Sequence, residues 1–153
     1  MVKQYTPDEG VDTCQQILRE CGVFNLRKAS RIVTQLYDDI LQPTGLRSTQ
    51  AVVLVMLEVE QELSMARMAH ELVLSPSTLS RNLARLEQDG LIETHPTGKR
   101  GKSVKLTARG RRALHKVLPY WQKAQQKFTG QVGVGEWADL RKHLNKTVTA
   151  VRG

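Results

Sequence analysis

The segment that most restricts the fold of this chain is SPSTLSRNLARLEQDG, residues 75–90. It opens with Ser75 and Pro76, a pair that favours the start of a helix, because Ser accepts hydrogen bonds from free backbone N–H groups and Pro fits the first helical position. It closes with Gly90, the residue type preferred just past a helix C-terminus. The sequence therefore predicts a helix over residues 76–89.

The two sides of this predicted helix differ sharply in chemistry. At about 100° per residue, Leu79, Leu83 and Leu86 share one side. The other side carries hydroxyl, guanidinium and amide groups, which read base edges in a DNA major groove and bind flanking phosphates. The helix N-terminus adds free N–H groups and a dipole that favours phosphate. The candidate DNA-binding residues of the segment are Ser75, Ser77, Thr78, Arg81, Asn82 and Arg85.

The preceding residues complete a helix-turn-helix pattern. Ser64 can cap a short helix over residues 65–72, and Val73 and Leu74 leave room only for a tight turn before Ser75. Taken alone, the polar helix could be an ordinary surface helix. The order of short capped helix, turn and polar helix favours a DNA-binding helix-turn-helix over about residues 64–89.

The following residues predict a basic β-hairpin. Two short extended runs, LIETHP and SVKLT, flank the glycine-containing turn TGKRGK. A hairpin in this position, residues 91–107, is the wing of a winged helix-turn-helix over residues 46–107. Its candidate DNA contacts are Lys99, Arg100 and Lys102, and an arginine at the tip suits a narrow minor groove.

The rest of the chain predicts helices after a loose arm at residues 1–10. Apolar residues recur at three- and four-residue spacing, and Pro43, Gly45 and Gly90 separate the segments. Pro119 is expected to kink or interrupt the long helix that contains it. The fold class is therefore mostly α with a small β-hairpin wing. The expected helices outside the helix-turn-helix cover residues 11–20, 25–42, 48–61, 107–128 and 136–151.

Length and composition indicate one globular domain over residues 1–153. The chain is 40% hydrophobic and 25% charged, close to ordinary globular usage. No apolar run approaches the roughly 20 residues of a membrane span, and the polar start lacks a signal peptide. We expect a cytoplasmic protein without a membrane partner.

Charge favours a polyanionic partner. The net charge is +8, and no Asp or Glu occurs from Thr94 to Gly135, a stretch with ten Lys and Arg residues. Such a cluster steers a protein toward phosphate and releases counterions on binding. A solvated basic face that only confers solubility is the alternative explanation of the charge alone.

No pattern in the sequence indicates an enzyme, a metal site or a cofactor. The four histidines lack metal-ligand spacing among themselves and with the cysteines. The chain has no P-loop, no dinucleotide fingerprint and no nucleophile–base set. Cys14 and Cys21, if held on one straight helix, would lie about 10 Å apart, too far for a disulfide within that helix.

Three segments carry a resemblance to a known family. They are LRKASRIVTQLYDDILQPTGLRSTQ, STLSRNLARLEQDGLIE and KRGKSVKLTARG, the last with Leu106, Thr107 and Gly110 in a Leu-Thr-x-x-Gly pattern. The stretch from about residue 25 to 110 resembles the MarR family of bacterial transcriptional regulators. The resemblance implies a homodimer whose helices at residues 11–42 and 108–153 form the dimerisation region.

The resemblance also implies roles for particular residues. Two recognition helices would lie in successive major grooves of double-stranded operator DNA, with Arg81 and Arg85 as contacts and Arg100 at the wing tip. Two positions depart from the family pattern. Gly98 replaces an acidic residue that often orders the wing, and Thr94 replaces a frequent basic residue.

Relatives in this family respond either to small aromatic or phenolic effectors or to oxidants. For an effector, the expected pocket residues are Arg27, Ser30, Arg31, Tyr37, Met56 and Met65, although each taken singly suits a surface or core role. For oxidation, the candidates are Cys14 and Cys21, which can equally pack as small apolar side chains.

The sequence thus predicts a sequence-specific regulator, in the form of a repressor that a small ligand or cysteine oxidation releases from its operator. A non-specific architectural DNA-binding protein is the alternative, and a basic protein-interaction module is a third. The architectural protein would share the charge without needing the separation of leucines from arginines in residues 76–89.

Overall fold

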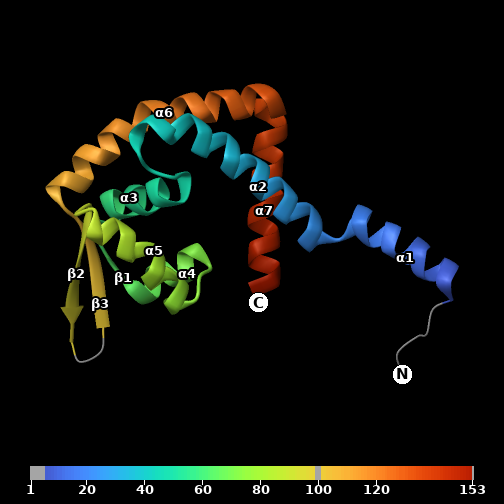
Figure 1. Cartoon of the computed structure of the whole chain (residues 1–153), viewed down its shortest axis with the longest axis horizontal. Coiled ribbons are helices and arrows are strands. Elements are labelled where there is room, and N and C mark those ends of the chain that lie inside the picture. Colours follow the sequence, from blue (N-terminus) through green and yellow to red (C-terminus); the bar gives the residue numbers. More distant parts are fainter. Residues whose placement is uncertain (1–5, 99–100, 153) are drawn as a thin grey trace. The chain divides into compact units, whose positions relative to one another are not determined.

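The computed structural model describes residues 6–98 and 101–152 of the chain (Figure 1). It is mostly helical with one small antiparallel sheet, which confirms the predicted fold class. The chain forms two compact units, residues 1–36 and 37–153. Helix α2 (Gly22–Leu41) runs from the first into the second.

The first unit contains α1 (Pro7–Glu20) and most of α2. Helix α1 begins earlier than predicted because Thr6 and Glu9 form a capping box, in which the Glu9 carboxylate accepts the Thr6 N–H at 3.0 Å. It ends at Cys21, whose backbone is extended. The Asn25 side-chain amide donates to the carbonyls of Arg19 and Cys21, both at 3.0 Å, and so holds the junction of the two helices.

The second unit contains the helix-turn-helix. Helix α3 (Ser48–Glu60) follows a short 3-10 turn, η1 (Gln42–Thr44), and precedes α4 (Met65–Leu72) and α5 (Pro76–Gln88). Helices α4 and α5 pack together, and α3 packs on α6. These bounds agree with the sequence prediction to within one residue.

A three-stranded antiparallel sheet follows the helix-turn-helix. Strand β3 (Gly101–Leu106) lies between β2 (Ile92–Thr97) and β1 (Glu62–Ser64). The β2–β3 hairpin is the predicted wing. Strand β1 was not predicted, and it is held by the pairing of Leu63 with Val104, both of which are buried.

Two helices complete the chain, α6 (Ala108–Val132) and α7 (Val134–Arg152). Pro119 lies inside α6 without ending it, so of the two expected effects, a kink or an interruption, the interruption does not occur. Leu114 and Val117 are buried before the proline and Ala124 and Phe128 after it. Packing on both sides thus offsets the hydrogen bond that the proline cannot make.

The core of the second unit is built mainly from leucines. Leu41, Leu54, Leu79 and Val104 are completely inaccessible to solvent, and this cluster takes side chains from α2 to α6 and from all three strands. Within the described residues, no helix combines the length and the apolar character needed to cross a bilayer.

Candidate nucleic-acid interface

Helix α5 presents one apolar and one polar face, as the sequence predicts. Leu79, Leu83 and Leu86 are at most 3% exposed and anchor the helix in the core. Ser75 caps it by accepting the Thr78 N–H at 3.2 Å, and Pro76 takes the first helical position. The leucines fix which side of the helix faces the solvent, and that side carries the predicted DNA-binding residues.

The polar face is open to a partner. Arg81, Asn82 and Arg85 are exposed. Arg85 donates from Nε to the Asp89 carboxylate at 3.0 Å, whereas Arg81 and Asn82 have no side-chain partner within residues 6–98 and 101–152. A guanidinium and an amide with unused donors are the groups that bind guanine and adenine edges.

The N-terminal turn of α5 forms a small hydroxyl cluster. The Ser75 hydroxyl lies 3.1 Å from that of Ser77 and 2.9 Å from that of Thr78. Ser75 and Ser77 are exposed and Thr78 is half-buried. These hydroxyls surround the positive end of the helix dipole, which favours a phosphate.

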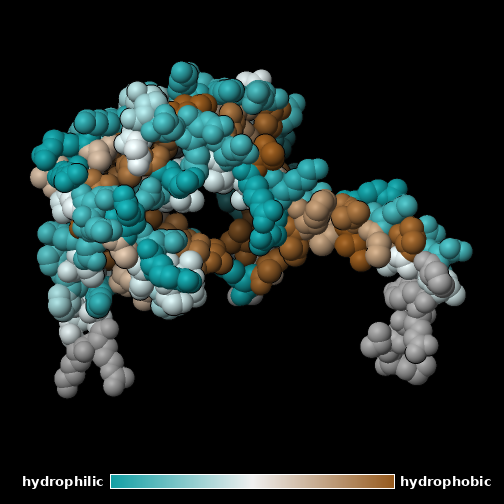
Figure 2. Space-filling view, viewed as in Figure 1, coloured by the Kyte–Doolittle hydropathy of each residue, from teal (hydrophilic) through white to brown (hydrophobic). Residues whose placement is uncertain are grey.

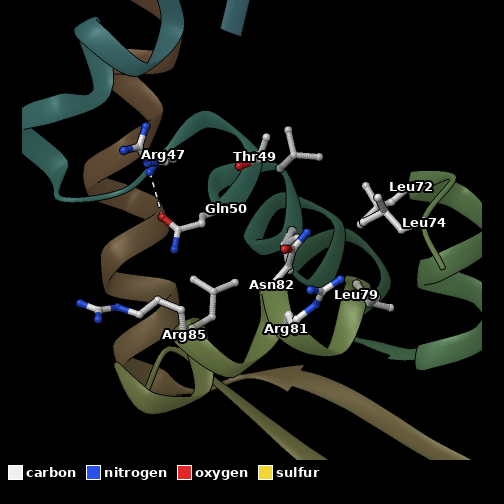
Figure 3. A pocket seen from close by; sticks show the side chains of 12 residues that line it. Arg47, Thr49, Gln50, Leu72, Leu74, Leu79, Arg81, Asn82 and Arg85 are labelled. Carbon is white, nitrogen blue, oxygen red and sulfur yellow. Dashed lines mark hydrogen bonds between the residues drawn. The ribbon is translucent and has the colours of Figure 1, made fainter. Parts of the chain in front are cut away.

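A hollow of about 490 Å³ opens beside the polar face of α5 (Figure 3). Leucines and valines are among its lining residues, and Arg81, Asn82 and Arg85 line it from α5. Arg47, at the start of α3, lines it from the other side, and its side chain is 77% exposed. The sequence prediction missed Arg47, although its place directly before the helix start at Ser48 is a signal for a phosphate contact.

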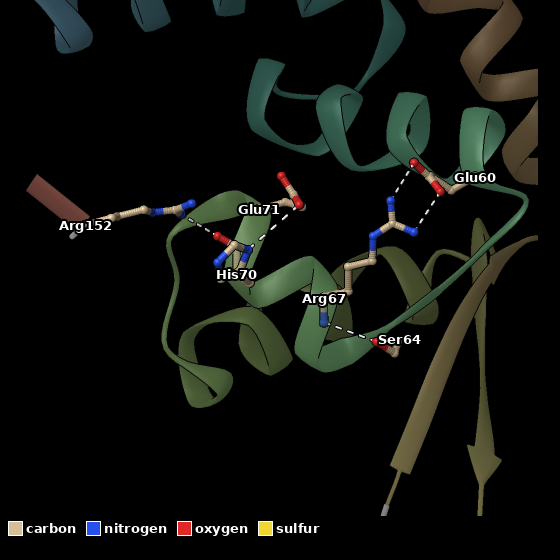
Figure 4. Close-up of polar contacts among 6 residues, drawn as sticks. All are labelled: Glu60, Ser64, Arg67, His70, Glu71 and Arg152. Carbon is tan, nitrogen blue, oxygen red and sulfur yellow. Dashed lines mark hydrogen bonds and ion pairs between the residues drawn. The ribbon is translucent and has the colours of Figure 1, made fainter. Parts of the chain in front are cut away.

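Hydrogen bonds hold both ends of helix α4 in place (Figure 4). Ser64 accepts the Arg67 N–H at 3.2 Å, and the Arg67 guanidinium makes two 2.9 Å hydrogen bonds to the Glu60 carboxylate at the end of α3. At the other end, Arg152 of α7 donates to the His70 carbonyl. These contacts position the helix from which α5 turns away.

The turn between α4 and α5 uses an unusual backbone conformation. Val73 has φ 54° and ψ 44°, in the left-handed region that a β-branched residue rarely adopts. The Leu74 N–H donates to the Ala69 carbonyl at 2.9 Å and closes the helix end. The tight turn sets the angle at which α5 leaves α4.

A polar network lies at the base of the wing. The Glu62 carboxylate accepts hydrogen bonds from the Ser103 hydroxyl at 2.5 Å and pairs with Lys105 at 3.0 Å. These two hydrogen bonds lower the pKa of Glu62 below its usual value, with further help from the positive charge of Lys105. Lys102 of β3 is exposed, whereas the predicted contacts Lys99 and Arg100 lie outside the described residues.

The six residues expected to bind an effector lie in different surroundings. Arg27 and Arg31 line a hollow of the first unit together with Cys21, and Ser30 is exposed near them in sequence. In the second unit, the Tyr37 hydroxyl donates to Gln125 at 2.6 Å, and burial raises the pKa of Tyr37. Met56 and Met65 pack against the core. Of the six, Arg27 and Arg31 share one hollow, and the joint role of all six stays a prediction.

Both cysteines are free thiols. Cys14 is exposed on α1, and Cys21 is half-buried between α1 and α2. Among the described residues, no group of three or more His, Cys, Asp or Glu side chains could hold a metal ion.

Comparisons with known proteins find the same fold in DNA-binding regulators. A family model described as the MarR family matches residues 44–101. A Bacillus cereus protein described as an uncharacterized HTH-type transcriptional regulator is 31% identical over 98 residues, which are 64% of this chain and 66% of that protein, slightly under two thirds of its length.

Two solved structures extend the match. The M. tuberculosis transcriptional regulator MosR in complex with DNA is 33% identical, with a TM-score of 0.79, over 87% of this chain and 97% of that one. A mutant of E. coli MarR complexed with operator DNA is 24% identical, with a TM-score of 0.76, over 86% of this chain and 96% of that one. The second likeness concerns the fold alone.

Proposed function

This chain belongs to the MarR family, whose members are DNA-binding transcriptional regulators and not enzymes, and we propose that it is a cytoplasmic, homodimeric repressor of specific operators. The observation that carries the proposal is the geometry of α5. Its leucines are buried, and Arg81 and Asn82 present unused donors to the solvent. A charge cluster that binds DNA without sequence preference would not need this separation.

Exposed apolar side chains support the homodimer. In the first unit, Val11, Ile17 and Leu18 of α1 are each more than half exposed, and Figure 2 shows apolar surface along this helix. Helix α7 has no fully buried residue and exposes Val134 and Val151. Two copies that intertwine these helices would cover both surfaces and set the distance between two α5 helices, which must match successive major grooves.

The test of specific DNA reading begins with selection of bound fragments from genomic DNA. The selected operator should then be retained against a large excess of bulk DNA at moderate salt. Arg81→Ala and Asn82→Ala should each abolish this preference, whereas Arg141→Ala on α7 should keep it. Equal binding of operator and bulk DNA would instead favour the architectural protein, and failure to select any genomic fragment would favour a protein-interaction module. Full retention of the preference by both α5 variants would show that α5 does not read the operator.

The same operator allows the repressor and dimer proposals to be tested. A reporter gene behind the operator should be expressed more strongly when the regulator is deleted; lower expression would make it an activator. Sedimentation should give twice the chain mass of 17.2 kDa at the concentrations where operator binds. A monomer bound to DNA would exclude the intertwined dimer.

Release from the operator is proposed to follow effector binding or cysteine oxidation. Either event would favour a dimer in which the two α5 helices have the wrong separation. Arginines at positions 27 and 31 suit a carboxylate, and the exposure of Cys14 permits reaction with an oxidant. Titration with salicylate tests the first route, and peroxide treatment of the wild type and of Cys14→Ser and Cys21→Ser tests the second. A route is rejected when operator affinity does not change.

A further inference from the structure

A second basic hollow of about 590 Å³ lies beside α6, on residues that the proposed DNA-reading face does not include. Arg109, Arg112 and Lys116 line it from α6. Leu46, from the turn before α3, and Leu91, from the turn after α5, also line it. We call this surface, defined by the three cations, the α6 basic hollow.

The charge of the α6 basic hollow is not compensated within the described part of the chain. All three cations are exposed, and none has an ion-pair partner among residues 6–98 and 101–152. The acidic residue that lines the hollow is Asp89, and its carboxylate already binds Arg85 at 3.0 Å. Helix α6 itself has no Asp or Glu, because none occurs from Thr94 to Gly135.

The position of these cations is unfavourable for the helix that carries them. Arg109 and Arg112 lie in the first two turns of α6, and its first turn has no acidic residue. The positive end of the helix dipole lies there, so cations are disfavoured and an anion is attracted. Helix stability therefore does not explain the cluster, whereas a bound anion would neutralise both the side chains and the dipole.

Residues of the α6 basic hollow neighbour residues of the hollow beside α5 at two places. Asp89 lines the hollow and binds Arg85, which lines the hollow beside α5. At the second place, Leu46 of the α6 basic hollow is next in sequence to Arg47 of the hollow beside α5. A DNA strand that passes Arg85 and Arg47 would therefore run toward residues that border the α6 basic hollow.

We propose that the α6 basic hollow binds phosphate groups of the DNA backbone, beside the major groove that α5 enters. The proposal rests on the proposed function and adds phosphate contacts from α6 to those of the helix-turn-helix and wing. Phosphate contacts carry no sequence information but raise the affinity for every sequence. The hollow thus contributes affinity and register, while Arg81 and Asn82 contribute sequence preference.

The test compares Arg112→Gln/Lys116→Gln with Lys123→Gln/Lys127→Gln, which removes two exposed cations from the same helix outside the hollow. Operator affinity is measured over a range of salt concentrations. Each phosphate contact contributes about 0.9 to the slope of log affinity against log salt. Because the proposed dimer carries two hollows, the hollow variant removes up to four contacts and should lose about 3.6 from the slope, about 1.8 per protomer. It should bind roughly a hundredfold or more weakly at 0.1 M salt, with an unchanged preference for operator over bulk DNA. The control should keep the wild-type slope.

Two further measurements separate the loss of charge from misfolding of the variant. Thermal unfolding shows whether the hollow variant folds, and Arg112→Lys/Lys116→Arg, which keeps both charges, should restore the slope. Equal slopes for the wild type and the folded hollow variant would overturn this proposal and leave the proposed function intact. The proposed function itself fails when Arg81→Ala retains operator preference, so the two failures are distinguishable.

The source of the phosphate is tested separately with inorganic pyrophosphate. At constant ionic strength, the hollow variant should bind pyrophosphate more weakly than the wild type, and the salt slope of operator binding should fall with it when the hollow serves DNA. If the variant loses pyrophosphate binding and keeps the wild-type salt slope, the hollow serves a free phosphate compound, and the assignment to DNA is wrong.

Discussion

The Asp38 carboxylate accepts two 2.7 Å hydrogen bonds from Ser48, one from its backbone N–H and one from its hydroxyl. Asp38 lies near the end of α2 and Ser48 begins α3, so one side chain joins two helices across the turn that separates them. Arg47 adds an ion pair at 3.2 Å. Although partial burial of the carboxyl opposes ionisation, these hydrogen bonds and the Arg47 charge lower the pKa of Asp38.

Replacement of Asp38 should weaken the second unit. Asp38→Ala leaves the first N–H of α3 without its acceptor, and we expect the free energy of unfolding to fall by about 1–3 kcal/mol. Asp39→Ala is the matched control, because Asp39 is exposed and its replacement should change stability little. Chemical denaturation measures both, and equal stability of the two variants would show that the Ser48 contacts contribute nothing net.

Alanine replacements at two glycines of α6 should change the stability of the protein in opposite directions. A Cβ on Gly110 would lie 2.0 Å from the Leu91 carbonyl oxygen and 3.1 Å from a Leu106 methyl group, whereas a Cβ on Gly130 would meet no atom within 4 Å. Gly110→Ala must push the start of α6 away from the wing, at a cost of about 1–3 kcal/mol or more. Gly130→Ala should stabilise the helix by about 0.5–1 kcal/mol. Thermal unfolding of both variants checks the pair, and a stable Gly110→Ala would contradict this packing.

The Glu62 network predicts a dependence of stability on pH. Because the pKa of Glu62 is lowered in the folded state, its ionised form contributes stability that is fully present above the ordinary glutamate pKa of 4.5. That contribution is lost as the pH falls through the lower, folded-state pKa. Glu62→Gln should therefore be less stable than the wild type at pH 7, and the difference should vanish at the acid end of a denaturation series. A difference that grows on acidification would reverse the sign and exclude this account.

Most of the second unit could be predicted from the sequence because its signals are local. Ser75, Pro76 and Gly90 mark the ends of α5 by their backbone chemistry, and the three leucines that follow the cap mark its buried side. The family resemblance further implied how these elements serve DNA binding. Each of these signals lies within one element or its immediate neighbours.

The missed features depend on contacts that are distant in sequence. Strand β1 has three residues, and it exists because Leu63 pairs with Val104, forty-one positions later. The α6 helix passes through Pro119 because of tertiary packing, against the local signal. Val73 adopts a left-handed conformation that its own side chain disfavours. The α6 basic hollow joins residues from three separate segments. The excess of Lys and Arg in the sequence could indicate a basic surface, but it could not show where in the fold that surface lies.

The last prediction separates the two roles assigned to Ser75. As the cap of α5, its hydroxyl accepts the Thr78 N–H, so Ser75→Ala should cost about 1 kcal/mol of stability. Ser80→Ala, an exposed position on the same helix, should cost less, since alanine is the better helix former.

Ser75→Asp supplies the decisive comparison. Aspartate caps as well as serine and interacts favourably with the helix dipole, so the free energy of unfolding should return to the wild-type value or exceed it. Its negative charge would nevertheless repel a phosphate held at the same helix end. If Ser75 faces the DNA backbone, Ser75→Asp must therefore combine wild-type stability with weakened binding to operator and bulk DNA alike. Gel-shift titrations measure the DNA affinity, and denaturation curves measure the stability. Undiminished DNA affinity in this variant would show that the start of α5 does not contact a phosphate.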